Sequence, residues 1–598
     1  MNARIPSRIS ALRDALREHD VQACLVPSAD PHLSEYLPDH WQARQWLSGF
    51  DGSAGTLVVT ADFAGLWTDS RYFEQAEQQL ADTGVTLMRL RVPHTAEHVD
   101  WLLERLGEGD TLAVAGDSMS LSGARMLRKR LEKIGAHLRT DLDLPGAVWS
   151  DRPALPQAPV RAQAEGWRDG TCAQRIARLR ESMQAAGASH HLVSSLDDIA
   201  WITGLRGSDV EYNPVFLAHL LVEPAQCTLF VDPTKIDAKL SAQLQTDGIV
   251  VRAYADTVTA LNELPSDARV LLDPARVVVD IVDALPDTAR LIERANPSTA
   301  FKAIKSAAEI EHIRATMRED GAALVQGMRE IERRLQAGET VSELDVADVL
   351  REKRSQRPAF VGESFGTIAG YMANGALPHY HATPEHHAQL HADGLLLVDS
   401  GGQYEGGTTD ITRMWAFGET TPEQRRDCSL VLKGTIALSR ARFPAGSSGP
   451  QLDALARAPI WAEGGDYGHG TGHGVGYFLN VHEGPHGIRP PAPGGALVPL
   501  EPCMITSIEP GLYKSGRHGV RHENLAVVRT WQDTEFGSFL EFETLTLCPI
   551  DTRALDVELL DDAERAWLND YHARVEKALS PLLDDEDRRW LQQRCAPV

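Results

Sequence analysis

Two aspartates at the ends of short apolar runs are the first residues whose spacing suggests chemistry. The segment LLLVDSGGQYEGGTTDITRMW, residues 395–415, contains an apolar run that ends at Asp399, a Gly-rich turn and a second strand-like stretch with Asp410. A hairpin of this kind would place the two carboxylates side by side on neighbouring strands. Adjacent buried carboxylates repel each other and lose hydration unless a proton or a metal ion compensates.

A second segment has the same form. In ITSIEPGLYKSGRHGVRHENLAVV, residues 505–528, an apolar strand precedes Glu509, and a further strand after a turn carries Glu523. Between the two acidic pairs, HGTGHGVG, residues 469–476, places His473 within a run that contains four glycines. So many glycines disfavour a helix, and a strand or loop is expected in which His473 can approach a metal closely.

These residue types favour a pair of metal ions. Taken singly, an aspartate after a strand is more often a turn former, but the five residues together predict a site. They are too few for two separate ions, yet they suffice when carboxylates bridge two ions about 3.5–4 Å apart. Four carboxylates with one imidazole favour Mn²⁺, or Co²⁺, over metals that prefer thiolates. The predicted cluster consists of Asp399, Asp410, His473, Glu509 and Glu523.

The elements before this site form an internal repeat. RISALRDALREHDVQACLVPSAD, from Arg8, and RIARLRESMQAAGASHHLVSSLD, from Arg175, align at a constant offset. In each copy, apolar residues at helical spacing precede a short apolar run, which predicts a helix and then a strand. Two similar α/β domains in tandem are therefore expected.

Changes of composition suggest where the domains end. The Pro- and Ala-rich stretch 150–163 predicts a linker between the two copies. The character of the sequence changes after about residue 300, where a long amphipathic helical stretch begins. We expect three domains, at 1–155, 156–300 and 301–598.

The third domain is expected to contain long helices around a strand-rich centre. Residues 303–337 predict an amphipathic helix that is interrupted at Gly321, and residues 360–550 alternate strand-like runs with Gly-rich turns. Residues 556–592 predict a helical tail, whose apolar stripe favours core packing over a subunit contact.

Overall composition narrows the classes of function. The formal net charge of −25 disfavours nucleic acid and anionic membranes as partners. Seven cysteines without CxxC spacing argue against disulfides and a thiolate zinc site. The N-terminal residues lack the apolar core of a signal peptide, and no run of 18 apolar residues occurs, so a cytoplasmic location is expected.

Four segments resemble a known family. DSGGQYEGGTTDITR, HGTGHGVGYFLNVHEGP, SIEPGLY and GVRHENLAVV are similar, in this order, to the three-domain Xaa-Pro aminopeptidases (aminopeptidase P) of the pita-bread metallopeptidases, peptidase family M24B. The resemblance spans the whole chain. It implies an α/β and α+β multidomain fold: two creatinase-N-like α/β domains followed by a pita-bread catalytic domain with a helical C-terminal extension.

The resemblance also assigns roles to residues. It implies that the five acidic and imidazole side chains are metal ligands and that Glu509 is also the general base. It implies two divalent ions, with Mn²⁺ favoured and Zn²⁺ or Co²⁺ as alternatives, and a homodimer formed through the C-terminal domain. The remaining residues that it assigns to catalysis or substrate binding are His379, His469, His482 and Arg521.

The function that the resemblance implies is removal of the N-terminal residue from peptides that have proline in second position. One alternative is a prolidase-like dipeptidase, although two N-terminal domains favour the aminopeptidase, since prolidases usually carry one. Another is a catalytically silent peptide-binding scaffold on the same fold, but such proteins lose ligands that are present here. Two departures from the family pattern are Cys503, where a glycine is usual, and His522, where an apolar residue is usual.

Overall fold

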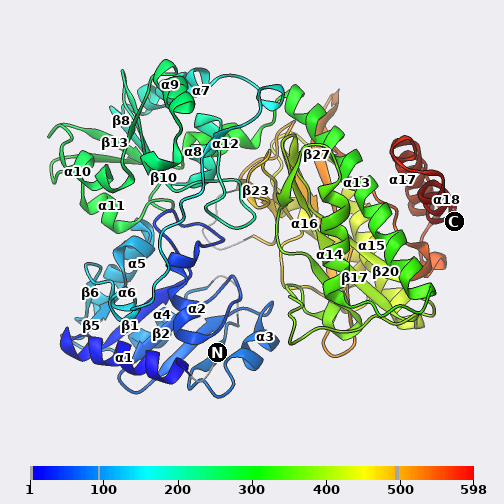
Figure 1. The fold of residues 1–598 in the computed structure, drawn as a ribbon, viewed down its shortest axis with the longest axis horizontal. Coiled ribbons are helices and arrows are strands. Elements are labelled where there is room, and N and C mark those ends of the chain that lie inside the picture. The colour runs from blue at the N-terminus through cyan, green and yellow to red at the C-terminus, as the bar shows by residue number, and fades with distance from the viewer. Residues whose placement is uncertain (1–3, 92–94, 492–496) are drawn as a thin grey trace. The chain divides into compact units, whose positions relative to one another are not determined.

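A computed structural model describes residues 4–91, 95–491 and 497–598. The chain forms two compact units (Figure 1). The first contains the residues up to Gln163 together with Gly170–Thr299, and the second contains Ala164–Asp169 together with Ala300–Val598. Within the described ranges, every helix is too short or too polar to cross a membrane.

The first unit contains two six-stranded mixed sheets with the same topology. Their strand orders are β4-β3-β2-β1-β5-β6 and β12-β11-β10-β8-β13-β14. In both sheets the second and third positions pair antiparallel, and the outer strands pair parallel to their neighbours. The predicted tandem repeat is therefore confirmed, while the predicted boundary between residues 155 and 156 stays a prediction.

The bounds of the first copy are α1 (Ile5–Glu18), β1 (Ala23–Pro27), α2 (Ala43–Ser48), β2 (Thr56–Thr60), β3 (Ala64–Thr68), α3 (Phe73–Gln79), β4 (Thr86–Arg89), α4 (Glu97–Leu103), β5 (Thr111–Ala113), α5 (Leu121–Leu131), β6 (His137–Arg139) and α6 (Leu144–Val148). Those of the second copy are β7 (Arg161–Ala162), α7 (Cys172–Ala186), β8 (His190–Val193), α8 (Leu196–Thr203), β9 (Leu205–Arg206), β10 (Ala218–Val222), β11 (Cys227–Val231), α9 (Ala238–Thr246), β12 (Ile249–Arg252), α10 (Thr257–Asn262), β13 (Arg269–Leu272), α11 (Val279–Asp283), β14 (Arg290–Glu293) and α12 (Pro297–Ala303).

The first helix of the second copy, α7, follows from its sequence. In α7, Thr171 and Gln174 form a capping box, which satisfies backbone N–H groups at the start of the helix. Ile176, Leu179 and Met183 recur at helical spacing and are buried. The helix therefore buries one apolar face and leaves its polar face in water.

The second unit consists of two half-units with a shared plan. Each begins with a helix pair, α13 with α14 and α15 with α16, and continues into an antiparallel strand pair with a small hairpin inserted between its strands. In the first half, β17 pairs with β20 and the insertion is β18–β19. In the second half, β24 pairs with β27 and the insertion is β25–β26. The two predicted half-units are thus present.

The bounds in this unit are α13 (Ala307–Gln336), α14 (Glu343–Ser355), β15 (Phe360–Glu363), β16 (Ile368–Tyr371), β17 (Leu395–Ser400), β18 (Gly402–Tyr404), β19 (Gly407–Thr408), β20 (Ile411–Ala416), α15 (Pro422–Ser439), β21 (Arg442–Pro444), α16 (Gly449–Trp461), β22 (Gly472–Gly474), β23 (Glu483–Ile488), β24 (Ile505–Ile508), β25 (Gly511–Lys514), β26 (His518–Arg521), β27 (Asn524–Thr534), β28 (Gly537–Thr544), α17 (Asp562–Leu579) and α18 (Asp585–Arg594).

The interruption predicted at Gly321 is wrong. Helix α13 runs without a break from Ala307 to Gln336. A Cβ atom at Gly321 would collide with the carbonyl oxygen of Leu547. The glycine is therefore needed because a segment that is distant in the sequence packs closely against the helix. This packing outweighs the low helix propensity of glycine.

The helical tail is part of the core of this unit. Leu568, Tyr571, Val575 and Leu579 of α17 are buried in the same apolar cluster as β17 and β20. The prediction of core packing is therefore confirmed. Helices α17 and α18 lie at one edge of the unit (Figure 1, red).

A six-residue segment directly after the predicted linker, residues 164–169, belongs to the second unit although the chain before and after it belongs to the first. We call this segment the linker strap. The hydroxyl of Tyr477 donates to the carbonyl oxygen of Trp167 at 2.8 Å. The Trp167 ring also meets the ring of His312 edge-on, with 4.9 Å between centroids. The strap is thereby attached to α13 and to the segment after β22.

Cys503 adopts a backbone conformation that suits glycine. Its φ is 70°, in the left-handed region, where a Cβ atom crowds the following carbonyl. The family pattern has glycine at this position, and the structure supplies the physical reason.

We predict that Cys503→Gly is more stable than Cys503→Ala by about 1 kcal/mol, because both variants lose the thiol but only glycine relieves the strain. Thermal and urea unfolding of the two variants measure the difference. An alanine variant as stable as the glycine variant would contradict the strain at this residue.

Candidate metal centre

The first predicted acidic pair lies at the adjoining ends of β17 and β20. Asp399 pairs in register with Thr412 and Ser400 with Ile411, so Asp410 lies just beyond the last pair. Both carboxylates are largely buried, with 8% of Asp399 and 5% of Asp410 exposed. The prediction that a hairpin brings these strands together is confirmed, although the connection contains the extra pair β18–β19.

The second pair is placed in the same way. Ile508 pairs with Asn524, the first residue of β27, so Glu509 directly follows β24 and Glu523 directly precedes β27. Glu523 is 1% exposed. The hydroxyl of Ser507 donates to Oε1 of Glu509 at 3.0 Å and orients that carboxylate. Each half-unit thus presents a pair of carboxylates at one end of an antiparallel strand pair.

His473 reaches both pairs from β22. Its Nδ1–H donates to the carbonyl oxygen of Gly474 at 2.9 Å, so Nε2 is directed towards the carboxylates. Nε2 lies 3.4 Å from Oδ2 of Asp410 and 3.3 Å from Oε1 of Glu509. As expected from the glycine-rich sequence, the segment is a strand and not a helix.

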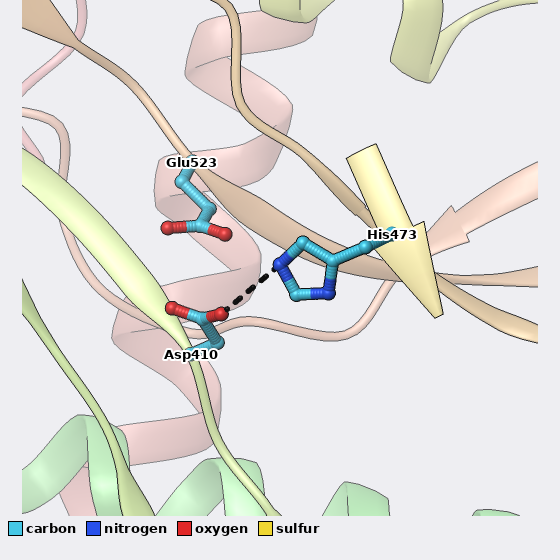
Figure 2. A group of neighbouring side chains, drawn as sticks. All are labelled: Asp410, His473 and Glu523. Carbon is cyan, nitrogen blue, oxygen red and sulfur yellow. Dashed lines mark ion pairs between the residues drawn. The ribbon is translucent and has the colours of Figure 1, made fainter. Parts of the chain in front are cut away.

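Three of the predicted ligands offer atoms that could share one ion. Ligand atoms of Asp410, His473 and Glu523 all lie within 4.8 Å of one another. Figure 2 shows the three side chains pointing towards one another from different segments of the chain and the ion pair between His473 and Asp410. Glu509 adjoins this group through His473.

Burial and mutual repulsion shift the pKa values of these carboxylates. Burial, the nearby Asp410 and Glu509 carboxylates and Asp399 raise the pKa of Glu523 well above its usual value. Burial raises the pKa of Asp399 to about 6, although the charge of Arg521 opposes the rise. Burial also raises the pKa of Glu509. Such shifts mean that the folded chain holds these carboxylates ionised only at a cost in free energy.

The imidazole responds in the opposite sense. Burial alone would lower the pKa of His473, but hydrogen bonding to Asp410 and the charges of Glu509 and Asp410 outweigh burial and raise the pKa to about 9. Without a metal ion, a proton on His473 therefore partly neutralises the cluster.

One guanidinium connects several of the site residues. Arg521 donates to Oδ2 of Asp399 at 2.5 Å and to the hydroxyl of Tyr513 at 2.6 Å. Its Nε donates to the hydroxyl of Thr412 at 3.0 Å, and that hydroxyl donates to Oε2 of Glu523 at 2.9 Å. Arg521 was predicted as a substrate-binding residue, whereas here it lies against a predicted ligand.

Sequence reasoning missed three residues that orient the site: Thr412, Ser507 and Tyr513. All three lie within the segments that carry the family resemblance, but no spacing between residues indicates a polar contact across strands. Only the paired register of the strands reveals them.

His482 and His469 connect to the same group through their rings, whereas His379 connects to it through its backbone neighbour. The ring of His482 meets the ring of His473 edge-on, with 4.4 Å between centroids. Nδ1–H of His469 donates to the carbonyl of Gly470, so Nε2 accepts from the hydroxyl of Tyr513 at 2.8 Å. His379 lies next to Pro378, whose carbonyl oxygen accepts from Arg521 at 3.4 Å. The side chain of His379 is partly exposed.

Comparison with known families places these features in context. Residues 312–530 match metallopeptidase family M24, and residues 538–598 match the C-terminal region of that family. Residues 8–141 and 151–309 each match the creatinase/prolidase N-terminal domain.

Relatives match over the full length. A probable Xaa-Pro aminopeptidase P of Laccaria bicolor is 40% identical, and the alignment covers 99% of this chain and 93% of the relative. Aminopeptidase P2 of Arabidopsis thaliana is 38% identical, with 97% of this chain and 86% of the relative covered. The chain belongs to the Xaa-Pro aminopeptidases of metallopeptidase family M24.

A solved structure agrees with this assignment. The X-prolyl aminopeptidase of Caenorhabditis elegans, described as a cytosolic enzyme with a di-nuclear active site, superposes with a TM-score of 0.93 at 32% identity. The match covers 99% of this chain and all of that one. The predicted fold, two creatinase-N-like domains with a pita-bread catalytic domain, is confirmed, as is the class of enzyme, a metallopeptidase.

The residues of this metallopeptidase fit a di-nuclear metal site, which is typical of family M24. Among the described residues, Oδ1 of Asp399 and Oε1 of Glu523 are buried without a hydrogen-bond partner. Buried carboxylate oxygens without donors are costly, and divalent cations would satisfy them. Oxygen ligands with one imidazole suit hard or borderline cations.

We predict that metal binding at pH 7 releases at least one proton per protein. Because the pKa of His473 is raised to about 9 without metal, its imidazole is protonated at pH 7 and must lose that proton before Nε2 can bind an ion. Apparent affinity for Mn²⁺ should therefore rise roughly tenfold per pH unit between pH 6 and 8. Isothermal titration in two buffers with different ionisation enthalpies counts the protons, and a count of zero would contradict the raised pKa.

A second prediction concerns Glu523→Gln. The amide removes a buried negative charge that Asp410, Glu509 and Asp399 repel, so the metal-free variant should be more stable than the metal-free parent at pH 8 by on the order of 1–2 kcal/mol. The same variant should lose most of the thermal stabilisation that Mn²⁺ confers on the parent. Differential scanning calorimetry with and without Mn²⁺ measures both effects. A metal-free variant that is less stable than its parent would show that repulsion does not dominate here.

Proposed function

We propose that this metallopeptidase releases the N-terminal residue from peptides with proline in second position, at a two-metal site formed by both half-units. The proposed ligands are Asp399, Asp410, His473, Glu509 and Glu523. The observation that supports this proposal best is the convergence of Asp410, His473 and Glu523 in a chain that matches aminopeptidases P over its full length. When bound, two divalent ions would lower the pKa of a water and polarise the scissile carbonyl.

The side chains around the ligands would carry out the proton transfers. Glu509, which Ser507 orients, would take a proton from the attacking water and deliver it to the proline nitrogen as that nitrogen leaves. His482 and His379 would donate hydrogen bonds to the scissile carbonyl oxygen as negative charge develops on it. His469 would contact the substrate from a fixed orientation, because Tyr513 and Gly470 hold both of its ring nitrogens.

Exposure indicates from which side a peptide would arrive. The side chains of His473 and Glu509 are 22% and 18% exposed, whereas that of Asp410 is 6% exposed. Substrate would therefore approach over His473 and Glu509, with Asp410 and Glu523 beneath. This direction agrees with Glu509 as the proton carrier, since the general base must reach the leaving nitrogen.

Further features of the assignment are also proposals. We propose Mn²⁺ as the native metal, with Zn²⁺ or Co²⁺ as alternatives, a homodimer formed through the C-terminal domain, and a cytoplasmic location. Three domains, at 1–155, 156–300 and 301–598, are proposed on the grounds given by the sequence. Arg521 would act on substrate only indirectly, through Asp399 and Tyr513.

We predict that the Mn²⁺-loaded enzyme cleaves tripeptides and longer peptides that begin Xaa-Pro, including one that begins Arg-Pro-Pro, because nothing in an exopeptidase site requires a carboxylate directly after proline. Turnover is measured by mass spectrometry on matched di-, tri- and pentapeptides, and peptides with alanine in place of proline test the specificity.

Two outcomes would contradict this function. Cleavage confined to dipeptides would identify a prolidase-like dipeptidase, and no cleavage with no stoichiometric metal would identify a peptide-binding scaffold. Glu509→Ala serves as the control: it should fold but lose at least about 10³-fold in kcat, which ties the activity to this site.

A further inference from the structure

Glu343, which has no assigned role, is a fully buried carboxylate in the second unit. It is the first residue of α14 and is 0% exposed. Its carboxylate accepts hydrogen bonds from the backbone N–H of Tyr371 at 2.7 Å and of Ala388 at 2.6 Å. It also accepts from the side-chain amide of Asn374 at 3.0 Å and from the hydroxyl of Tyr380 at 2.8 Å. One side chain therefore holds four separate groups.

All four donors lie in one segment, residues 371–388, which we call the histidine loop. The loop begins at Tyr371, the last residue of β16, and contains one short 3₁₀ helix at Met372–Ala376; its other residues are in neither helix nor strand. Glu343 holds its first residue and its last, and also holds Tyr380, the direct neighbour of His379. On the other side of His379, the carbonyl of Pro378 accepts from Arg521. His379 is thus carried by a loop whose fixed points are a carboxylate and a guanidinium.

The chemistry of Glu343 suits this task. An ionised carboxylate only accepts hydrogen bonds, so it satisfies four donors at once, whereas an amide would direct N–H groups at some of them. Its position in the first turn of α14 places its charge at the positive end of the helix. Burial and the charge of Glu343 raise the pKa of Tyr380, which keeps its hydroxyl a donor.

We infer that Glu343 is a positioning residue for peptide hydrolysis: by holding the histidine loop at both ends and at Tyr380, it fixes His379 at the scissile carbonyl. The inference rests on the proposed function, in which His379 contacts that carbonyl. Loss of the four hydrogen bonds would free the loop and displace the imidazole. Displacements of about 1 Å can cost about 100-fold in rate.

A double-mutant cycle with Glu343→Gln and His379→Ala tests the inference on the Mn²⁺-loaded full chain, with an Xaa-Pro tripeptide as substrate. Glu343→Gln should lower kcat about tenfold, with KM changed less than kcat and with the Mn²⁺ content unchanged. His379→Ala should lower kcat about 100-fold. The double variant should be no slower than His379→Ala, because a positioning residue has no effect once the residue that it positions is gone.

Glu332→Gln is the matched control for lost stability. Glu332 is a buried carboxylate of the same unit that accepts from Trp590 and Arg594, far from any predicted ligand in sequence. It should lower the melting temperature as Glu343→Gln does but leave kcat within about twofold of the parent. If Glu343→Gln does not fold, Tyr380→Phe takes its place in the cycle, since it removes one hydrogen bond to Glu343 and should lower kcat about threefold.

The outcomes separate this inference from the proposed function. Additive losses in the cycle, or a Glu343→Gln variant with the kcat of the parent, would overturn the inference and leave the function intact. Parental kcat in His379→Ala would remove the proposed role of His379 and with it the inference. A non-additive cycle with a silent Glu332→Gln control supports both.

Discussion

The second unit is built around several carboxylates of like charge that are buried close together, and their repulsion constrains the rest of its structure. Four carboxylates lie close to one imidazole, and the guanidinium of Arg521, which is paired with Asp399, contributes a permanent positive charge beside them. Burial without compensation would favour protonated carboxylates or a different fold. The strand register and the hydroxyl of Thr412 hold these groups in place against the repulsion between the carboxylates. Bound cations would remove that repulsion and so stabilise the folded chain.

The half-unit plan solves this problem twice with the same geometry. In each half, the two acidic residues lie at one end of an antiparallel strand pair. The chain between the two paired strands forms a small hairpin at that end. The insertion explains why the acidic residues of a pair are eleven and fourteen residues apart rather than the few of a tight turn. His473 comes from β22, which pairs with β24 in the same sheet as the second acidic pair.

Sequence reasoning succeeded where local pattern and physics coincide. The apolar runs that end at Asp399 and Glu509 predicted buried strands, and the carboxylates at their ends predicted a charged centre. The resemblance added the histidines and Arg521. It did not reveal that Arg521 contacts Asp399 while Thr412 links it to Glu523, because these contacts depend on strand register.

Two failures have a common physical cause. Gly321 was read as a break in a helix because propensity is local, whereas its reason is the carbonyl of Leu547 more than 200 residues away. Glu343 gave no signal beyond a helix start, because its four partners lie 28 to 45 residues later and are ordinary loop residues. The role of a buried polar group depends on its hydrogen-bond partners, and a single sequence does not show which residues these are.

The linker strap has a consequence for the modularity of the chain. The catalytic unit is not one continuous stretch of chain, since it includes Trp167, which in the sequence lies between the strands of the first N-terminal sheet and those of the second. A fragment cut to begin near residue 300 would contain every proposed ligand but leave the hydroxyl of Tyr477 without that acceptor and one side of the His312 ring uncovered. The two N-terminal domains therefore cannot be removed without effect on the second unit, because the segment that joins them is part of that unit. An exchange of either domain between relatives must keep this segment intact.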